Sequence, residues 1–227
     1  MKKHFSIIAC LFMALSSFLV SCGDTKSDSK SDPYNGHEYV DLGLPSGIKW
    51  ATCNVGATKP EEFGGYYAWG ETEEKENYDF ETYKWCRGSN DNMTKYCTDS
   101  DYGRVDNKTV LEPQDDVAHV KWGGSWRMPT FDEQRELLNE CSWEWTELDG
   151  VPGHIVTGPN GNSIFLPAAG YRDGTEVDVR GSDGGYWSSS LYVSSSGYAC
   201  GLGFGSVGSG WNSPSRDYGL SVRPVSE

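Results

Sequence analysis

Apolar and polar positions alternate over short segments of this chain, and the alternation predicts many short strands. Period two runs through residues 37–42 and 48–51, and residues 43–47 between them, which contain Gly and Pro, predict a hairpin turn. Similar segments predict further strands at residues 66–69, 155–157, 163–166, 186–189, 198–204 and 220–225. Residues 71–108 are polar with scattered aromatic side chains, so we expect a long, irregular excursion on the surface.

Only two segments carry a helical pattern. Residues 115–121 predict a short helix with an acidic first turn, whose inner face would contain Val117, Ala118 and Val120. A clearer helix begins at Thr130, which forms a capping-box pattern with Glu133. Its inner face is expected to contain Leu137, Leu138 and Cys141. Two helices among short strands and long loops predict the α+β class.

The amino-terminal residues predict export. Lys2 and Lys3 precede an apolar stretch at residues 5–20, which is shorter than the roughly 20 apolar residues that a membrane-spanning helix needs. Residues 19–22 (Leu-Val-Ser-Cys) resemble the bacterial lipobox. This resemblance implies cleavage before Cys22 and lipidation of that residue, with ordinary signal-peptidase cleavage nearby as the alternative.

The export signal and the composition after it divide the chain into three predicted segments. They are a lipoprotein signal peptide at residues 1–21, a flexible acidic and polar tether at 22–35, and a single domain at 36–227 that contains a ligand-binding region at 186–225. Acidic residues soon after Cys22 also resemble surface-export signals of Bacteroidetes lipoproteins. The resemblance implies a protein that is lipid-anchored in the outer membrane and exposed at the cell surface.

The negative charge of the chain limits the classes of partner that we expect. The formal net charge is −14, and loss of Lys2 and Lys3 with the signal peptide makes it −16. Nucleic-acid binding depends on cationic side chains that neutralise phosphates, so we expect no nucleic-acid partner. The strong negative charge also favours solubility and repels anionic surfaces.

The cysteines predict disulfide bonds in an oxidising compartment. Five cysteines follow Cys22, so at least one of them would remain unpaired. Cys86 with Cys97 would close a short polar loop, and Cys53 with Cys141 is a second candidate pair. Because spacing does not determine connectivity, other pairings stay open, and Cys200 is the candidate for the unpaired thiol.

The segment from Tyr186 to Val225 has the composition of a recognition surface. Sixteen of the twenty-eight residues at 188–215 are Ser or Gly, and Gly201, Gly203 and Gly205 alternate with apolar residues. Tyrosine supplies rigid contact area, while Ser, Gly and Asn adapt their hydrogen bonds to a ligand. The alternative is a Gly- and Ser-rich edge of a β-domain without a binding role.

Several motifs resemble known families. Residues 122–130 (WGGSWRMPT) and the predicted helix after them resemble an element of formylglycine-generating enzymes and their C-type-lectin-like relatives. Together with the runs at 36–57, 66–71, 163–174, 185–190 and 221–225, they resemble the Fibrobacter-major-paralogous-domain proteins of gut Bacteroidetes. This resemblance implies a C-type lectin-like fold with two helices, short antiparallel strands and long loops that form a recognition face.

A narrower resemblance concerns the Gly- and Ser-rich segment. Residues 201–205 (GLGFG) and 211–218 (WNSPSRDY), followed by SVRPV, resemble the variable region of proteins diversified by retroelements, which is rewritten at adenine positions. The resemblance implies that Leu202, Phe204, Val207 and Trp211 hold the frame while Gly, Ser, Asp and Tyr occupy substituted positions. A relative that is not diversified is the alternative.

Catalytic and metal-binding patterns are weak. The paired cysteines of formylglycine-generating enzymes are missing, and His37, His119 and His154 lie in unrelated segments, so we expect no enzyme activity and no cofactor. Residues 99–103 lack the closing Glu of a calcium loop, and residues 158–160 (Gly-Pro-Asn) lack a ligand of the calcium-dependent sugar-binding motif. We therefore expect no metal site, although a calcium-free sugar site stays open.

The predicted function is ligand binding by a surface-displayed lipoprotein. The partner would be a protein or glycan of another cell, phage or host, and the predicted contact or substituted positions are Tyr192, Ser194, Ser196, Tyr198, Gly201, Gly203, Gly205, Gly208, Gly210, Trp211, Ser213, Ser215, Asp217 and Tyr218. Trp211 is expected either to anchor the ligand or to fill the core beneath the loops, and the second role is favoured. Two other classes of function stay open, namely a structural component of the envelope or a pilus tip, and a degraded or unusual enzyme of the formylglycine-generating type.

Overall fold

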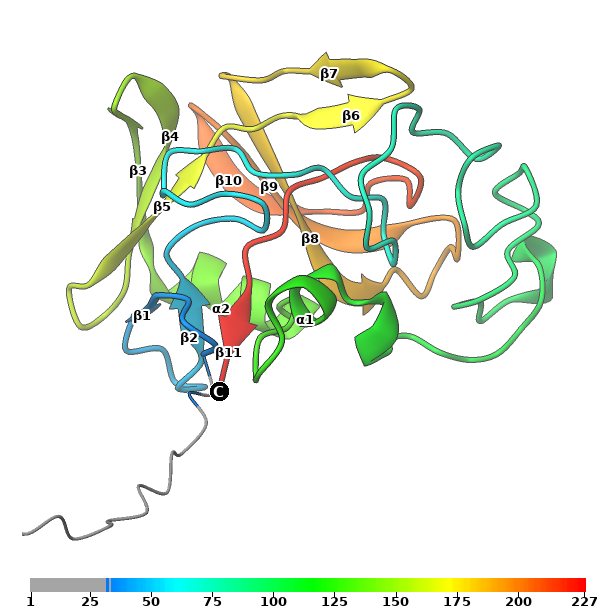
Figure 1. Ribbon diagram of the computed structural model, residues 1–227, viewed down its shortest axis with the longest axis horizontal. Helices are drawn as coiled ribbons and strands as arrows, with labels where there is room; N and C mark the ends of the chain where they lie inside the picture. The colour runs from blue at the N-terminus through cyan, green and yellow to red at the C-terminus, as the bar shows by residue number, and fades with distance from the viewer. Residues whose placement is uncertain (1–31, 33) are drawn as a thin grey trace, which may run out of the picture. The chain divides into compact units, whose positions relative to one another are not determined.

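The computed structural model describes residues 32 and 34–227, and this part of the chain is mostly β-structure (Figure 1). Its strands form four small sheets in which every pairing between strands is antiparallel. They are β1 (Tyr39–Asp41), β2 (Lys49–Ala51), β3 (Ser142–Leu148), β4 (Val151–Thr157), β5 (Ser163–Pro167), β6 (Tyr171–Asp173), β7 (Glu176–Asp178), β8 (Asp183–Leu191), β9 (Ala199–Gly205), β10 (Gly208–Asn212) and β11 (Val225–Ser226). The helices are α1 (Val117–Trp122) and α2 (Phe131–Glu140), with 3-10 turns η1 (Ser100–Tyr102) and η2 (Pro113–Asp115).

The predicted α+β class with a C-type lectin-like fold is wrong. The described residues contain eleven strands but only two α-helices, of six and ten residues, so helix does not form a layer of its own. The sequence pattern located both helices correctly, but it missed β3, β6, β7 and β10. β6 and β7 have only three residues each, and β10 is rich in Gly and Ser, so these strands lack the apolar alternation from which strands are predicted. β3 was missed although Trp143 and Trp145 alternate with polar residues.

The ends of the domain meet in one sheet. The predicted hairpin of β1 and β2 forms, and β11 pairs with the other edge of β2, so that Val225 lies opposite Trp50. Trp50 and Val225 are buried with apolar residues of β5, β8 and β9 in one core cluster. The predicted strand at 220–225 is therefore much shorter, and most of it is an extended segment held by isolated bridges.

The sheet β10-β9-β8 carries the Gly- and Ser-rich segment, and it lies between α2 and the β6-β7 hairpin (Figure 1). The predicted capping box of α2 is present, since the Thr130 hydroxyl accepts from the Glu133 N–H and the Glu133 carboxylate accepts from the Thr130 N–H. Gln134 of α2 is buried and donates to the carbonyls of Tyr186 and Trp187, which ties the helix to β8.

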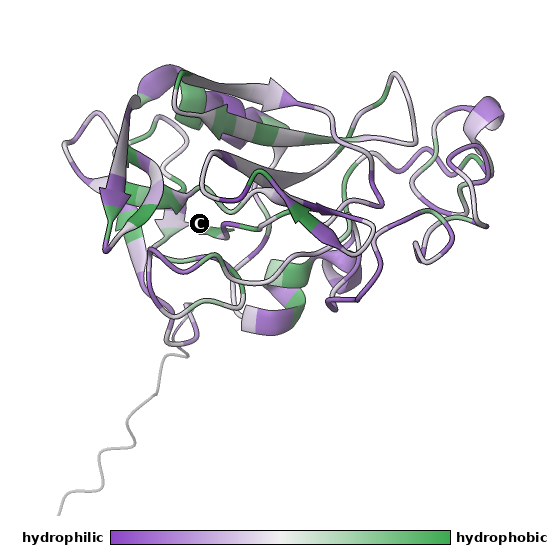
Figure 2. Ribbon diagram, turned by 90° about the horizontal axis from the view of Figure 1, so that it is seen from above, coloured by the Kyte–Doolittle hydropathy of each residue, from purple (hydrophilic) through white to green (hydrophobic). Residues whose placement is uncertain are grey.

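The excursion at residues 71–108 is irregular but does not lie only on the surface. It contributes a third buried cluster, whose members within the excursion are Tyr78, Tyr83, Met93 and Cys97. Figure 2 shows mostly hydrophilic colours on the loops of this region, whereas hydrophobic bands mark the strands. The prediction that this segment lies on the surface is therefore wrong in part, because a few widely spaced aromatic residues are enough to form a buried cluster.

Two fully buried arginines hold loops in place. The Arg223 guanidinium donates to the Asn54 side chain and to the carbonyls of Ala51, Thr52 and Phe165. Arg216 donates to the Tyr83 hydroxyl and to three carbonyls. Among residues 32 and 34–227 neither arginine has an ion-pair partner, so their charges are compensated by oriented backbone dipoles.

The tryptophans expected in the core are found there or at its rim. Five are buried, namely Trp50, Trp69, Trp122, Trp126 and Trp187, and Trp143 and Trp145 are partly buried. None of the helices in the described part of the chain is both long and apolar enough to cross a membrane.

Candidate ligand-binding site

One face of the β10-β9-β8 sheet is almost bare of side chains. Gly201, Gly203 and Gly205 alternate along β9 with Leu202 and Phe204, which are buried on the opposite face in the core. Residues paired directly across strands point to the same face. The pairing register gives this face its other members, which are Asp183, Gly185 and Trp187 of β8 and Gly208, Gly210 and Asn212 of β10. The bare part of the face ends at Trp187, because its ring is buried in a core cluster.

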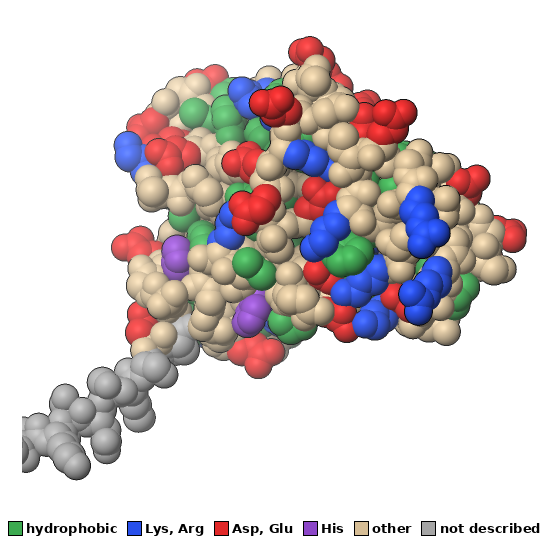
Figure 3. Space-filling view, turned by 45° about the vertical axis from the view of Figure 1, so that its right-hand side comes forward, with side chains coloured by type: hydrophobic (Ala, Val, Ile, Leu, Met, Phe, Trp, Pro, Cys, Tyr) green, Lys and Arg blue, Asp and Glu red, His purple; other side chains and the backbone are tan. Residues whose placement is uncertain are grey.

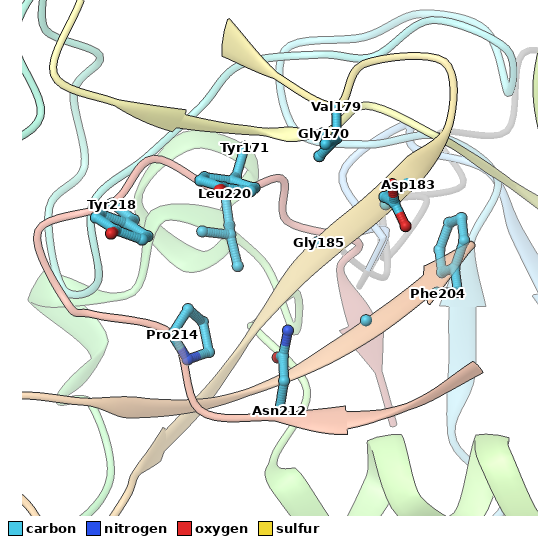
Figure 4. Close-up of a pocket in the computed structure, with 12 residues that line it drawn as sticks. Gly170, Tyr171, Val179, Asp183, Gly185, Phe204, Asn212, Pro214, Tyr218 and Leu220 are labelled. Atoms are coloured by element: carbon cyan, nitrogen blue, oxygen red, sulfur yellow. The ribbon is translucent and has the colours of Figure 1, made fainter. Parts of the chain in front are cut away.

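A cavity of about 380 Å³ lies over this face. Gly185 and Gly203 belong to its floor, and Gly170, Tyr171 and Val179 line it from the side of the β6-β7 hairpin (Figure 4). The remaining lining residues are Asp183, Gly184, Phe204, Asn212, Pro214, Tyr218 and Leu220. The volume falls within the range of about 300 to 1,000 Å³ that is typical of small-ligand sites.

Gly170 allows the segment before β6 to approach the end of β7 closely. It has a φ of +68°, and a Cβ atom there would lie 2.0 Å from the Asp178 carbonyl oxygen. Its N–H donates to the Asp183 carbonyl, which fixes the start of β6 against the start of β8. No residue other than glycine fits this conformation and this contact without moving the backbone.

Two polar side chains offer hydrogen-bonding groups to the cavity. The Asn212 side chain points from β10 toward Gly185, and within the described ranges its amide has no hydrogen-bond partner (Figure 4). Asp183 lies across the floor, and its carboxylate accepts a hydrogen bond from the Ser182 hydroxyl at 2.9 Å. Asp183 forms no ion pair with any described residue, so one amide and one carboxylate are available to a ligand.

Two stacked tyrosines form the aromatic wall. The rings of Tyr171 and Tyr218 are 5.4 Å apart between centroids, with 13° between their planes. Burial, followed by the nearby Asp173 and Asp217 carboxylates, raises the pKa of Tyr218 to about 12. Burial likewise raises the pKa of Tyr171, with further increments from the surrounding carboxylates. Both phenols are therefore neutral at physiological pH and act as hydrogen-bond donors or aromatic surfaces.

The predicted contact residues do not form one patch. Tyr192, Ser194 and Tyr198 lie in or beside the loop between β8 and β9, at the opposite end of β9 from the β9-β10 turn. The seven residues of β9 separate these two ends by about 20 Å. The region thus divides into a floor of glycines beside the cavity and a separate loop that contacts residues 90 and 98 of the excursion.

Three of the predicted contact residues are buried, so the prediction that they contact a ligand is wrong. Ser196 is 0% exposed and its hydroxyl accepts from the Thr98 N–H at 3.1 Å, so it holds the loop. Gly201 is buried as well. Asp217 is 4% exposed and accepts from Ser215, which makes both of them parts of a turn that contains the buried Arg216.

Trp211 does not fill the core as favoured from the sequence. Its side chain lies on the face opposite the glycines, is 55% exposed, and packs against Phe131 of α2 with 5.8 Å between ring centroids. Ser213 is half-buried between this strand and Pro214. Trp211 is therefore an exposed aromatic at the sheet edge that cannot share a small ligand with the cavity.

Not every glycine of the face has room for a side chain. A Cβ atom on Gly201 would lie 2.9 Å from the Tyr186 carbonyl oxygen, a backbone atom, so this position is structural. A Cβ atom on Gly203 would lie 2.8 Å from Nδ2 of Asn212, which can swing away. Gly208 and Gly210, the β10 members of the face, have open space.

Sequence reasoning missed the cavity residues outside the Gly- and Ser-rich segment. Tyr171 was assigned no role, and Asp183 and Asn212 were not among the predicted contacts. The pairing Gly201–Asn212 could have suggested Asn212, because both belong to the strands flanking the β9-β10 turn. Nothing in the local sequence places Tyr171 near Tyr218, because they are brought together by the bridge between Arg172 and Gly219.

The cysteines are not bonded in the pairs proposed from the sequence. Cys53, Cys86, Cys97, Cys141 and Cys200 are all free thiols in the structure. Cys53 packs on one core cluster and Cys141 on another, whereas the Cys86 and Cys97 thiols each donate to a nearby backbone carbonyl. Cys22, the proposed lipidation site, lies outside the described residues.

The three histidines in the described part of the chain lie apart and contact different groups. His37 stacks on Trp122 at 3.8 Å, and His154 is enclosed by aromatic rings that include Phe204. His119 contacts the Trp126 carbonyl at 3.3 Å. A search of the described residues finds no group of three or more His, Cys, Asp or Glu side chains that could hold a metal ion.

A cationic surface lies beside the Trp85 ring. Figure 3 shows Lys and Arg side chains gathered on one part of a face that otherwise carries dispersed carboxylates. Lys84 and Lys95 lie over the Trp85 ring, at 4.3 and 4.8 Å from its centroid. Lys95 also forms ion pairs with Glu112 and Asp115, so its charge is already compensated. The cavity with its free polar groups is the better candidate site.

Comparison with known proteins adds one finding. A family model described as a domain of unknown function (DUF8237) matches residues 154–225, which is less than half of the chain. The matched segment contains every residue that lines the cavity. No curated protein and no solved structure matches this chain.

Proposed function

We propose that this chain is an exported, lipid-anchored binding protein of the outer-membrane surface. It recognises a protein or glycan of another cell, phage or host through the cavity and the glycine-bearing face of the β10-β9-β8 sheet. Cys22 carries the lipid and residues 22–35 act as the tether in this proposal.

The observation that carries the proposal is the cavity itself. Small-ligand sites are typically concave and mostly apolar, with a few polar groups that orient the ligand. Here the Asn212 amide has no described partner, the Asp183 carboxylate has no described cation, and the stacked pair of Tyr171 and Tyr218 stands beside them. This combination of an apolar wall and a few polar groups is typical of ligand sites.

The glycines support diversification of the same face. Gly210 has open space, and side chains at Gly203 or Gly205 would first meet the movable side chains of Asn212 and Asp183. New side chains at these three positions would change the floor or the rim of the cavity without disturbing the core. Gly208 also has open space, but its φ of +159° disfavours any other residue. Gly201 is excluded, because its Cβ atom would meet a backbone carbonyl.

The DNA next to the gene tests diversification. We expect a near-copy of the segment that encodes residues 186–225, differing at adenine positions and lying beside a reverse-transcriptase gene. Variation between the copies should fall at the codons of Gly203, Gly205 and Gly210 and spare that of Gly201. A copy that varies mainly at buried positions would contradict the diversification proposal.

A binding experiment tests the function. Fluorescently labelled full chain is incubated with intact bacteria, host cells, phage particles and a printed glycan array. We expect saturable binding to at least one of these surfaces and at least a tenfold loss of affinity with Tyr218→Ala, which removes half of the aromatic wall. Tyr39→Ala is the matched control, since Tyr39 is 41% exposed on β1, its ring contacts that of Tyr34, and it does not line the cavity.

Two outcomes would reject the proposal. Binding that is equal for Tyr218→Ala and the unchanged chain would place recognition elsewhere. Absence of binding to all surfaces, together with co-purification of envelope or pilin subunits that survives Tyr218→Ala, would favour the structural role.

A further inference from the structure

The cavity is surrounded by negative charge. Asp183 lines it directly, and Asp173 and Asp178 lie on the hairpin strands β6 and β7 that cover it. The carboxylates of all three raise the pKa of Tyr171, after the larger effect of burial, and no lysine or arginine counteracts them at that ring. The electrostatic potential at the aromatic wall is therefore negative.

The nearest arginines are engaged elsewhere. Arg172 follows Tyr171 on β6, so its side chain points to the other face of the hairpin, where it lies over the Tyr78 ring at 5.3 Å and donates to the Thr175 carbonyl. Arg180 lies over the Phe63 ring at 5.2 Å and donates to the Tyr66 hydroxyl. No cation among the described residues is therefore positioned to neutralise Asp183.

The cavity offers the three features that an organic cation requires. The aromatic rings of Tyr171 and Tyr218 attract a cation through their electron-rich faces. The Asp183 carboxylate supplies an ion-pair partner, and the Asn212 amide oxygen supplies a neutral acceptor. The glycine floor lets the alkyl stem of a long side chain lie close to the backbone of β8 and β9.

We propose that this cavity receives a lysine or arginine side chain of a partner protein, an inference that rests on the proposed binding function and selects a protein ligand over a glycan. The side chain would enter with its stem along the glycine floor and its charged group between Asp183 and the tyrosine pair. Charge complementarity favours this occupant, because the chain carries a formal net charge of −14 and the carboxylates around the cavity are unpaired among the described residues. A cavity of about 380 Å³ also suits one side chain better than an extended oligosaccharide.

Short peptides test the proposal on the full chain. The probes are acetyl-Gly-Lys-Gly-amide and acetyl-Gly-Arg-Gly-amide, with the Gln and Glu peptides of the same form and methyl α-glucoside as comparisons. Binding is followed by shifts of the backbone amide signals of Gly185 and Gly203 and of the Asn212 side-chain amide in proton–nitrogen spectra. We expect the cationic peptides to bind at least tenfold more tightly than the Gln peptide, and the difference to shrink when the salt concentration rises.

Two variants test which carboxylate contributes to binding of the Lys peptide. Asp183→Asn should weaken binding of the Lys peptide about fivefold or more, since the ion pair is lost while the shape is kept. Asp101→Asn, an exposed position on η1 of the excursion, removes the same charge elsewhere and should leave binding unchanged. Because the peptide comparison is made on the unchanged chain, it remains decisive if Asp183→Asn fails to fold.

The outcomes separate this inference from the proposed function. Equal binding of the Gln and Lys peptides, preferential binding of the glucoside, or no peptide binding at all would overturn the cationic ligand. If cell or phage binding is nevertheless lost in Tyr218→Ala, the proposed function stands with another ligand class. If the cationic peptides bind but no surface does, the proposed function fails and the cation pocket remains.

Discussion

Replacement of Arg216 tests how the wall of the cavity is held. Its guanidinium is 0% exposed and donates to the carbonyl oxygens of Lys95, Tyr96 and Ser196 at 3.1, 3.1 and 2.8 Å. It also donates to the Tyr83 hydroxyl and lies 4.7 Å from the centroid of the Trp69 ring. The residue thus joins the loop that carries Pro214 and Tyr218 to the excursion.

The expected loss of stability follows from the carbonyl oxygens that would be left without a hydrogen-bond donor. The three carbonyls lie outside helices and strands, and no other donor from the described residues reaches them. Each buried acceptor without a partner costs about 1–3 kcal/mol, so Arg216→Met is expected to lower the free energy of unfolding by about 3–5 kcal/mol after relaxation. Arg216→Lys keeps the charge but cannot span three carbonyls, and it should cost about 1–3 kcal/mol.

Urea denaturation followed by tryptophan fluorescence measures this effect. With a slope of about 2 kcal/mol per molar urea, Arg216→Met should lower the midpoint by about 2 M. The control is Arg135→Met, since Arg135 is exposed on α2, where it forms a 3.4 Å ion pair with Asp132 and lies 5.8 Å from the centroid of the Phe131 ring, and its effect should stay within about 0.5 kcal/mol. A loss below about 1 kcal/mol for Arg216→Met at unchanged slope would refute the reasoning, because it would show that the guanidinium is not required to satisfy these carbonyls.

Two further predictions concern pH and thiol chemistry. Burial tends to raise the pKa of Glu133, but its two hydrogen bonds with Arg127, at 2.8 and 2.6 Å, outweigh this and hold the pKa below its usual value. The ionised Glu133 therefore stabilises the folded state above its unfolded pKa of about 4.3, and this stabilisation is lost as pH falls through the lower folded pKa. Between pH 5 and pH 3, the urea midpoint of Glu133→Gln should therefore fall less than the midpoint of the unchanged chain. Equal losses for both proteins would show that Glu133 does not contribute. Burial raises the pKa of the Cys141 thiol to about 11, so native Cys141 should react with a disulfide reagent at pH 8 at least tenfold more slowly than after unfolding, as checked by peptide mapping of the labelled protein. A native rate equal to the unfolded one would contradict this.

Local patterns predicted the elements whose signals are contained in a few neighbouring residues. The capping box of Thr130 and Glu133 located the start of α2, and apolar alternation located the hairpin of β1 and β2. The fold class was wrong because it depended on how the elements pack, and β10 was missed because Gly and Ser at residues 208–210 carry no apolar alternation.

The sequence by itself determined that the Gly- and Ser-rich segment has one apolar face and one bare face, because side chains alternate strictly along a strand. Only the tertiary structure decided what the bare face does. Pairing of β9 with β8 and β10 placed Asn212 and Asp183 beside the glycines, and the bridge between Arg172 and Gly219 brought Tyr171 against Tyr218. These contacts join residues that are distant in sequence, and the backbone pairing that creates them leaves no local pattern from which they could be predicted.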